Sequence, residues 1–131
     1  MIAIDTSALI ALIFSESEAP AFAERLAHER RIMIGAPTVL ETLMVVFGRT
    51  GAVDLVEVDR ILSRPEIEVV AWTAHHAALA FKAFQRFGKG NHRASLNYGD
   101  CMSYAVAQLA DAPLLYKGDD FAQTDVISAL P

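Results

Sequence analysis

Residues 2–10, IAIDTSALI, decide the fold of this chain. Residues 2–4 are a short apolar run, which predicts a buried strand. Asp5 follows that strand directly, and Thr6 or Ser7 can cap a helix that we expect to run to about Phe14. A strand that passes at once into a helix, with an acid at the junction, is the pattern on which the remaining interpretation builds.

The same alternation continues to the end of the chain. Apolar strands are expected at 32–34, 67–71, 114–116 and near 126–127. Helices are expected at 17–30, 37–47 (closed by Gly48), 52–62, 73–87 (capped by Thr73) and 98–110. Strands that alternate with helices form parallel units with helices on both faces. We therefore predict one domain over residues 1–131, a three-layer α/β/α sandwich with a central, mainly parallel sheet.

Composition narrows the class of protein. A hydrophobic fraction of 53% is ample for the core of a 131-residue domain. The single cysteine, Cys101, excludes an internal disulfide, which suits a reducing compartment. We see no signal peptide and no apolar run near the ~18 residues of a membrane helix. We expect a cytoplasmic protein with no membrane partner.

The formal net charge of −5 argues against binding nucleic acid through bulk positive charge. It does not argue against an enzyme whose acids hold metal ions, because the metal restores positive charge where a phosphate must sit. The distribution of the acids therefore matters more than their number.

Several acids follow predicted strands. Asp5 comes after the first strand, and Asp119 and Asp120 come after the strand at 114–116. In parallel sheets, ligands bind beyond the carboxyl ends of the strands. These acids are therefore expected where the architecture places a site.

Two more acids lie on predicted helices. Glu41 has Thr38, Met44 and Val45 as neighbours three or four residues away, so its helix face is mostly apolar. Asp100 falls in the first turn of its helix, where an acid also suits the helix dipole. Taken singly, these acids could be helix caps, a partly exposed helix flank or a surface turn.

Together the acids predict a shared cation, because carboxylates that share one site need a counter-charge. An oxygen-rich set without Cys or adjacent His ligands suits Mg²⁺ or Mn²⁺. Such ions acidify water and stabilise in-line displacement at phosphorus, so we predict metal-dependent cleavage of a phosphodiester bond.

The chain resembles the PIN-domain family, and specifically the VapC toxins of VapBC toxin–antitoxin pairs. Four stretches carry the resemblance over essentially the whole length: 4–9 (IDTSAL), Glu41 after 37–40 (PTVL), 88–101 with GKG, HRA and LNYGDC, and 114–125 with LLYKGDDF and TD. The first stretch alone is weak, whereas the third and fourth in this order and spacing are specific.

The resemblance implies an Mg²⁺- or Mn²⁺-dependent endoribonuclease, silenced by a VapB-like antitoxin and often homodimeric, with tRNA or rRNA among the possible targets. It implies site acids at Asp5, Glu41 and Asp100, with Asp5 and Asp100 as the usual metal ligands. Asp120 is preferred as the fourth acid, and Asp119 is the alternative.

Other residues are candidates for supporting roles. Thr6 and Ser7 could hydrogen-bond a ligand, and Asn97 could orient Asp100, although all three are also capping residues. The clearest basic patch is a glycine-containing loop that could meet RNA phosphates or simply be solvated. Its residues are Arg86, Lys89, His92 and Arg93.

Aromatic residues suggest partner surfaces. Trp72, Phe81, Phe84 and Phe87 are expected in the core or on a dimer surface, whereas Phe14, Phe22 and Met44 could line a groove for an antitoxin helix.

Two other functions compete with the ribonuclease. A phosphohydrolase could use Asp5 as a covalent nucleophile, but such sites usually have a second Asp two positions on, and here that residue is Ser7. A non-catalytic binding module for RNA or protein would tolerate loss of the acids.

Overall fold

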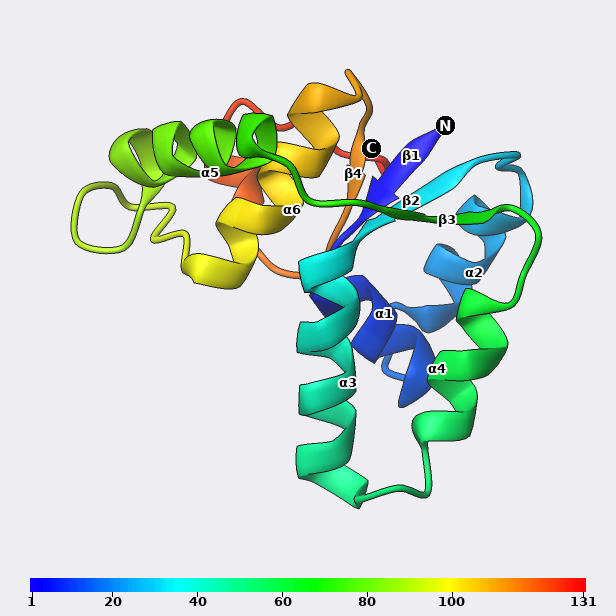
Figure 1. Ribbon diagram of the computed structural model, residues 1–131. Coiled ribbons are helices and arrows are strands. Elements are labelled where there is room, and N and C mark those ends of the chain that lie inside the picture. Colours follow the sequence, from blue (N-terminus) through cyan, green and yellow to red (C-terminus); the bar gives the residue numbers. More distant parts are fainter.

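A central sheet of four parallel strands organises the molecule, and the computed structural model describes every residue from Met1 to Pro131 (Figure 1). The strands are β1 (Ile2–Ile4), β2 (Ile32–Gly35), β3 (Ile67–Val70) and β4 (Leu114–Leu115), in the order β3-β2-β1-β4. The chain moves outward from β1 through β2 to β3 and then returns to the other side of β1. The connections therefore diverge at β1, which is where a parallel sheet opens a crevice for ligands.

Helices cover both faces of the sheet, as predicted (Figure 1). One layer holds α5 (Ala74–Phe87) and α6 (Tyr98–Leu109). The opposite side holds α1 (Thr6–Ile13), α2 (Ala19–Ala27), α3 (Ala36–Thr50) and α4 (Leu55–Leu62). α3 begins where β2 ends and runs away from the sheet beside α1 and α4 (Figure 1).

Alternating side chains of the strands build two cores. Ile2 and Ile4 pack with residues of α1 and α2, whereas Ala3 packs with residues of α5 and α6. The side chains of β2 alternate in the same way, and Met33 packs with residues of α5 and α6. Because both faces of β1, β2 and β4 are buried, these strands contain no charged residue, and this is why their short runs were readable in the sequence. The edge strand β3 is only partly buried and contains Glu68.

The predicted boundaries fail at three places. Gly48 does not end its helix; α3 continues to Thr50 and ends at Gly51, whose φ of +64° favours glycine. The second helix, expected over 17–30, spans only Ala19–Ala27, and the fourth begins at Leu55 rather than at residue 52.

No strand forms at 126–127, contrary to the prediction. The Thr124 hydroxyl accepts a hydrogen bond from the Val126 N–H at 3.1 Å, so a turn uses a donor that a strand would need. A short 3₁₀ turn, Phe121–Gln123, precedes this point, and only an isolated parallel bridge from Ser128 to Leu114 follows it.

None of the helices is both long enough and apolar enough to cross a membrane, in agreement with the absence of a predicted membrane segment.

Candidate active site

Asp5 is buried at the end of β1, with only 4% of its surface exposed. It caps α1 itself, in place of Thr6 or Ser7: its Oδ2 accepts bonds from the Ser7 N–H at 3.0 Å and the Ser7 hydroxyl at 2.6 Å. Its Oδ1 accepts a bond from the Ser103 hydroxyl at 2.5 Å. Three donors thus stabilise a charge that would be costly to bury alone.

Ser103 belongs to a layer of buried hydroxyls beneath the acids. Its Oγ lies 3.4 Å from the Thr38 Oγ1, which joins α6 to α3. Ser103 is one turn beyond Asp100, and Thr38 is one turn before Glu41. Neither hydroxyl was predicted from the sequence, although each lies three residues from an acid on a predicted helix.

Glu41 projects from α3 toward the first turn of α6. Its carboxylate accepts a hydrogen bond from the Thr6 hydroxyl. A Cβ added at Gly99 would lie 2.1 Å from the Glu41 Oε2, so the carboxylate packs directly on the backbone of α6. Only glycine leaves room for this approach, and the helix N-terminus there favours a negative charge. Gly99 was not singled out from the sequence.

Asp100 is half-buried in the first turn of α6, in a reciprocal capping arrangement with Asn97. The Asn97 N–H donates to the Asp100 Oδ2 at 3.0 Å, and the Asp100 N–H donates to the Asn97 Oδ1 at 2.9 Å. Asn97 therefore both caps the helix and orients the acid. Burial, and then the charges of Asp5, Asp120 and Glu41, raise the pKa of Asp100 to about 6.

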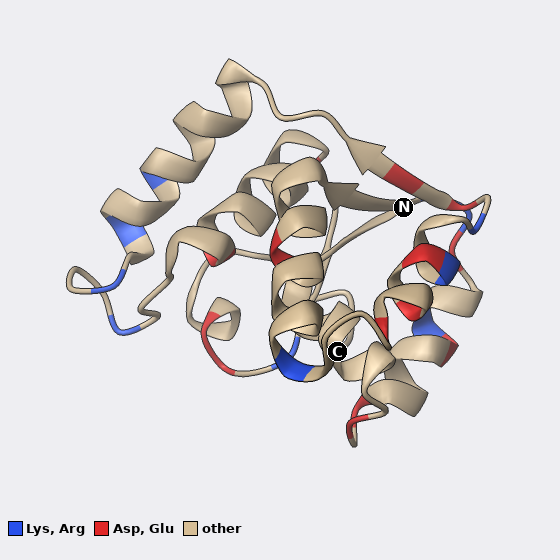
Figure 2. Ribbon diagram, turned by 60° about the horizontal axis from the view of Figure 1, so that its bottom comes forward, with Lys and Arg blue, Asp and Glu red and all other residues tan.

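One open hollow of about 480 Å³ contains Asp5, Glu41 and Asp100, together with Thr6 and Ser7. Asp5 stands at the end of the central strand, and the other two acids reach it from α3 and α6. In Figure 2, acidic positions on α3, on the first turn of α6 and on the loop after β4 lie around one region between these elements. The structure thus brings together three acids that are far apart in the sequence.

Asp119 and Asp120 are exposed on the loop after β4 and do not line this hollow. The charge of Asp120 is among those that raise the pKa of Asp100, whereas the charge of Asp119 is not. This difference favours Asp120 as the fourth acid of the site.

The predicted basic patch lies outside the hollow, on the end of α5 and the loop after it (Figure 2). Arg86 is paired with Asp125 at 3.0 Å and stacks on the Phe87 ring. The His92 Nδ1 accepts a bond from the Ala94 N–H at 3.0 Å, which closes the loop. Two other basic side chains, Lys89 and Arg93, are exposed and lack an ion-pair partner.

The donor set of the hollow fits a hard divalent cation. No three His, Cys, Asp or Glu side chains converge closely enough to ligate one ion together as they stand. Their oxygens are nevertheless the ligands that such ions prefer. The pKa of Asp100 is raised by burial and then by the charges of neighbouring acids, and a bound cation would offset both causes. Asp5 and Asp100 would hold the cation, with Glu41 and Asp120 close by.

Known proteins are similar to this chain in sequence and in fold. The family model for the PIN domain matches residues 2–127. Ribonuclease VapC36 of Mycobacterium tuberculosis is 47% identical over 124 residues, which covers 94% of this chain and 89% of that protein. The chain therefore belongs to the PIN-domain family, and within it to the VapC group.

Two solved structures share the fold at low sequence identity. The crystal structure of Mycobacterium tuberculosis VapC20, described as a toxin that cleaves the sarcin–ricin loop, has a TM-score of 0.81 at 19% identity and covers 100% of both chains. A toxin–antitoxin complex from Klebsiella pneumoniae has a TM-score of 0.69 at 23% identity and covers 98% of each chain.

Gly99→Ala tests the close approach of Glu41. The added methyl should push the carboxylate away from Thr6 while the fold persists, with a free energy of unfolding lowered by about 1 kcal/mol. A crystal structure and urea denaturation measure both effects. The control is Gly48→Ala, where a methyl would meet nothing within 4 Å. An unmoved Glu41 in the Gly99 variant would contradict the steric interpretation.

Asp100→Asn tests the cost of an ionised carboxylate at this position, which comes from burial and from the neighbouring acids. A pKa raised from 3.8 to about 6 means that the folded protein loses stability as the pH rises through this window. In EDTA, the variant should therefore be more stable than the wild type at pH 7.5, on the order of 1 kcal/mol because solvent reaches the half-buried side chain and reduces the cost of its charge. Near pH 4 the two proteins should unfold alike, and a stability difference that is constant with pH would contradict this account.

Proposed function

We propose that this chain is a divalent-metal-dependent endoribonuclease, the toxin of a toxin–antitoxin pair, and that it uses Mg²⁺ or Mn²⁺. The observation that carries the proposal is the meeting of Asp5, Glu41 and Asp100 in one open hollow at the carboxyl ends of β1 and β4. The names of its relatives support the substrate class, since VapC36 is named a ribonuclease. A cytoplasmic site of action follows, because RNA and a cognate antitoxin would be met there.

Each acid has a distinct role in this reaction. A bound divalent cation would supply positive charge against the phosphate oxygens and acidify an attacking water. Asp5 is held rigidly by three donors, so it serves as a fixed ligand. Glu41 lines the hollow, where its Oε1 accepts a bond from Thr6 and its Oε2 lies against Gly99, and we assign it the role of taking a proton from the attacking water. Asp100 completes the ligand pair, and Asn97 sets its orientation.

The structure disfavours covalent catalysis by Asp5. Both of its oxygens accept hydrogen bonds and the residue is 4% exposed, whereas a nucleophile must reach the phosphorus atom. Ser7, two positions on, binds Asp5 in place of the second acid that such enzymes use. A purely binding role leaves unexplained why Asp5, Glu41 and Asp100 share one hollow without an ion-pair partner for any of them.

For the antitoxin, we propose an apolar stripe on α3 as the main docking surface. Leu40, Met44 and Phe47 recur at the spacing of one helix face, and all three are exposed. The stripe adjoins Glu41, so an antitoxin helix laid on it would also cover the acids. Phe22, expected to help line such a groove, is instead buried in the core beneath α2.

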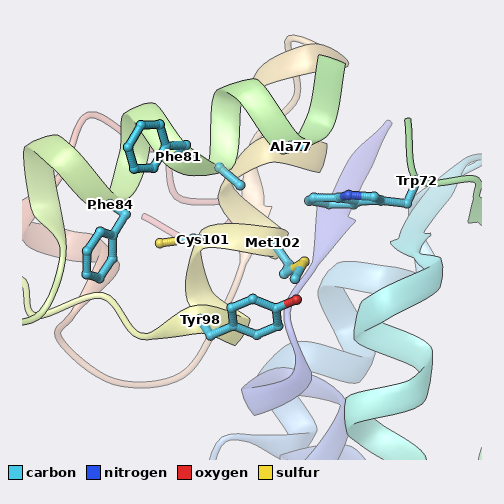
Figure 3. A pocket seen from close by; sticks show the side chains of 8 residues that line it. Trp72, Ala77, Phe81, Phe84, Tyr98, Cys101 and Met102 are labelled. Carbon is cyan, nitrogen blue, oxygen red and sulfur yellow. The ribbon is translucent and has the colours of Figure 1, made fainter. Parts of the chain in front are cut away.

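For the second subunit of a homodimer, we propose the apolar hollow between α5 and α6. It measures about 410 Å³, and Figure 3 shows the side chains that surround it from α5, α6 and the segment before α5. Phe81 is 61% exposed and Tyr98 is 80% exposed, so each copy carries prominent rings beside a hollow that can receive the partner's rings. Phe87, by contrast, belongs to the core.

Substitution of the acids tests the catalytic proposal. Asp5→Asn, Glu41→Gln and Asp100→Asn should each lower the rate of RNA cleavage by about 100-fold or more, because each removes a ligand or a proton acceptor. Sequencing of the 5′ ends produced from total RNA measures the rate and locates the cleavage sites. EDTA should abolish cleavage, and Mg²⁺ or Mn²⁺ should restore it.

The control is Asp59→Asn, an exposed acid on α4, which should cleave like the wild type. Among the two loop acids, Asp120→Asn should slow cleavage and Asp119→Asn should not. Undiminished cleavage by both the Asp5 and the Asp100 variants would exclude the mechanism.

Phe81→Ser tests the dimer surface. Loss of an exposed ring at the centre of an interface should weaken the dimer by at least about tenfold in dissociation constant. Sedimentation equilibrium measures this constant. Val53→Ser, at an exposed apolar residue distant from the hollow, is the matched control. Equal dissociation constants for the two variants would place the dimer surface elsewhere.

A further inference from the structure

Two basic side chains line the same hollow as the acids. They are Arg49 and Lys117, and no other Lys or Arg does so. Arg49 lies eight residues beyond Glu41, about two turns along α3. Lys117 follows β4, and its N–H donates to the Ser7 hydroxyl at 3.0 Å, which in turn donates to Asp5. The backbone of Lys117 is thus two hydrogen bonds away from the central acid.

Glu16 holds both cations at the rim of the hollow. The Lys117 Nζ lies 2.9 Å from one Glu16 oxygen, and an Arg49 nitrogen lies 3.8 Å from the other. Glu18 adds a second contact to Lys117 at 2.9 Å, and Arg49 stacks over the Phe14 ring. The Arg49 and Lys117 side chains remain 51% and 39% exposed, so the ion pairs orient them toward solvent at little gain in stability.

RNA that enters the hollow needs such cations. The hollow contains four acids, Asp5, Glu16, Glu41 and Asp100, in a chain of net charge −5. A cation held among the inner acids would meet one phosphate, but the neighbouring phosphates of the strand would still face negative charge. Arg49 and Lys117 are the two cations that line the same hollow.

The basic loop that the sequence predicts to bind RNA cannot by itself contact the phosphates on either side of the cleaved one. It lies outside the hollow, and Arg86 is already paired with Asp125. Its exposed cations, Lys89 and Arg93, belong to a different part of the surface.

We propose that Arg49 and Lys117 bind the RNA backbone phosphates that flank the scissile bond, exchanging their contacts with Glu16 for contacts with phosphate. This role rests on the proposed ribonuclease function and adds two substrate-binding residues to it. Phosphate contacts fix the position of a strand without reading its sequence, so these residues would act on every RNA that the enzyme accepts.

The salt dependence of RNA binding tests this role. In an Asp100→Asn background that prevents cleavage, a fluorescein-labelled single-stranded RNA of mixed sequence is titrated with protein at several NaCl concentrations. The double variant Arg49→Met/Lys117→Met should bind about tenfold more weakly, and the slope of log K against log salt should fall by about 1.4, or about 0.7 per lost contact.

A charge-matched control separates local contacts from net charge. Lys82→Met/Arg60→Met removes two exposed cations outside the hollow and should leave the slope unchanged. If the double variant at the rim is unstable, the single variants should each show half of its effect, and Lys117→Arg should retain wild-type binding.

The possible failures are distinguishable. Absence of RNA cleavage by the otherwise unaltered chain in Mg²⁺ and in Mn²⁺ would remove the proposed function itself. Cleavage by that chain, combined with a rim variant whose salt slope equals that of the control, would overturn only the assignment of Arg49 and Lys117.

Discussion

The carboxylate of Asp5, buried at the end of the central strand, is the constraint on which the rest of the site depends. A buried carboxylate is costly unless donors surround it, and here the donors come from two helices, Ser7 on α1 and Ser103 on α6. These bonds tie α6 to the end of β1. The placement of α6 in turn brings Gly99 and Asp100 to the hollow. Because Gly99 has no side chain, the Glu41 carboxylate can approach α6 from α3. One buried charge therefore organises residues from three parts of the chain.

Much of the fold could be predicted because both faces of the sheet are covered. Short apolar runs marked β1 to β4, and Thr73 and Phe87 bound α5 as expected. The failures arose where sequence signals were ambiguous. Gly48 resembled a helix end, but only Gly51 has the backbone conformation that requires glycine. The apolar pair at 126–127 resembled a strand, but the side chain of Thr124 turns the chain there.

The acids of the candidate site could be predicted from the sequence, but their arrangement in space could not. The acids stood out because their sequence neighbours are apolar or follow strands. Ser103 and Gly99 did not, because a hydroxyl or a glycine near the start of a helix has many ordinary explanations. Their roles depend on contacts across 98 and 58 residues, respectively, with Asp5 and Glu41. Arg49 and Lys117 were missed for the same reason, since only the fold brings them to one hollow.

The proposed partner surfaces lie on different elements. The apolar stripe of α3 borders the acids, whereas the apolar hollow lies between α5 and α6. A second copy and an antitoxin would therefore not compete for the same side chains. The antitoxin would cover the hollow that contains the acids, whereas the proposed dimer contact shares none of the residues that line that hollow.

The position of β4 has a consequence for synthesis on the ribosome. β4 is the last strand to be made, yet it pairs directly with β1, the first. Until residues 114–115 emerge, β1 has an open edge, and until residue 103 emerges, Asp5 lacks one of its donors. A growing chain therefore cannot assemble the active site before residue 103 and residues 114–115 have been translated. A protein that would damage the RNA of its own cell thus lacks a complete active site until those residues have been made.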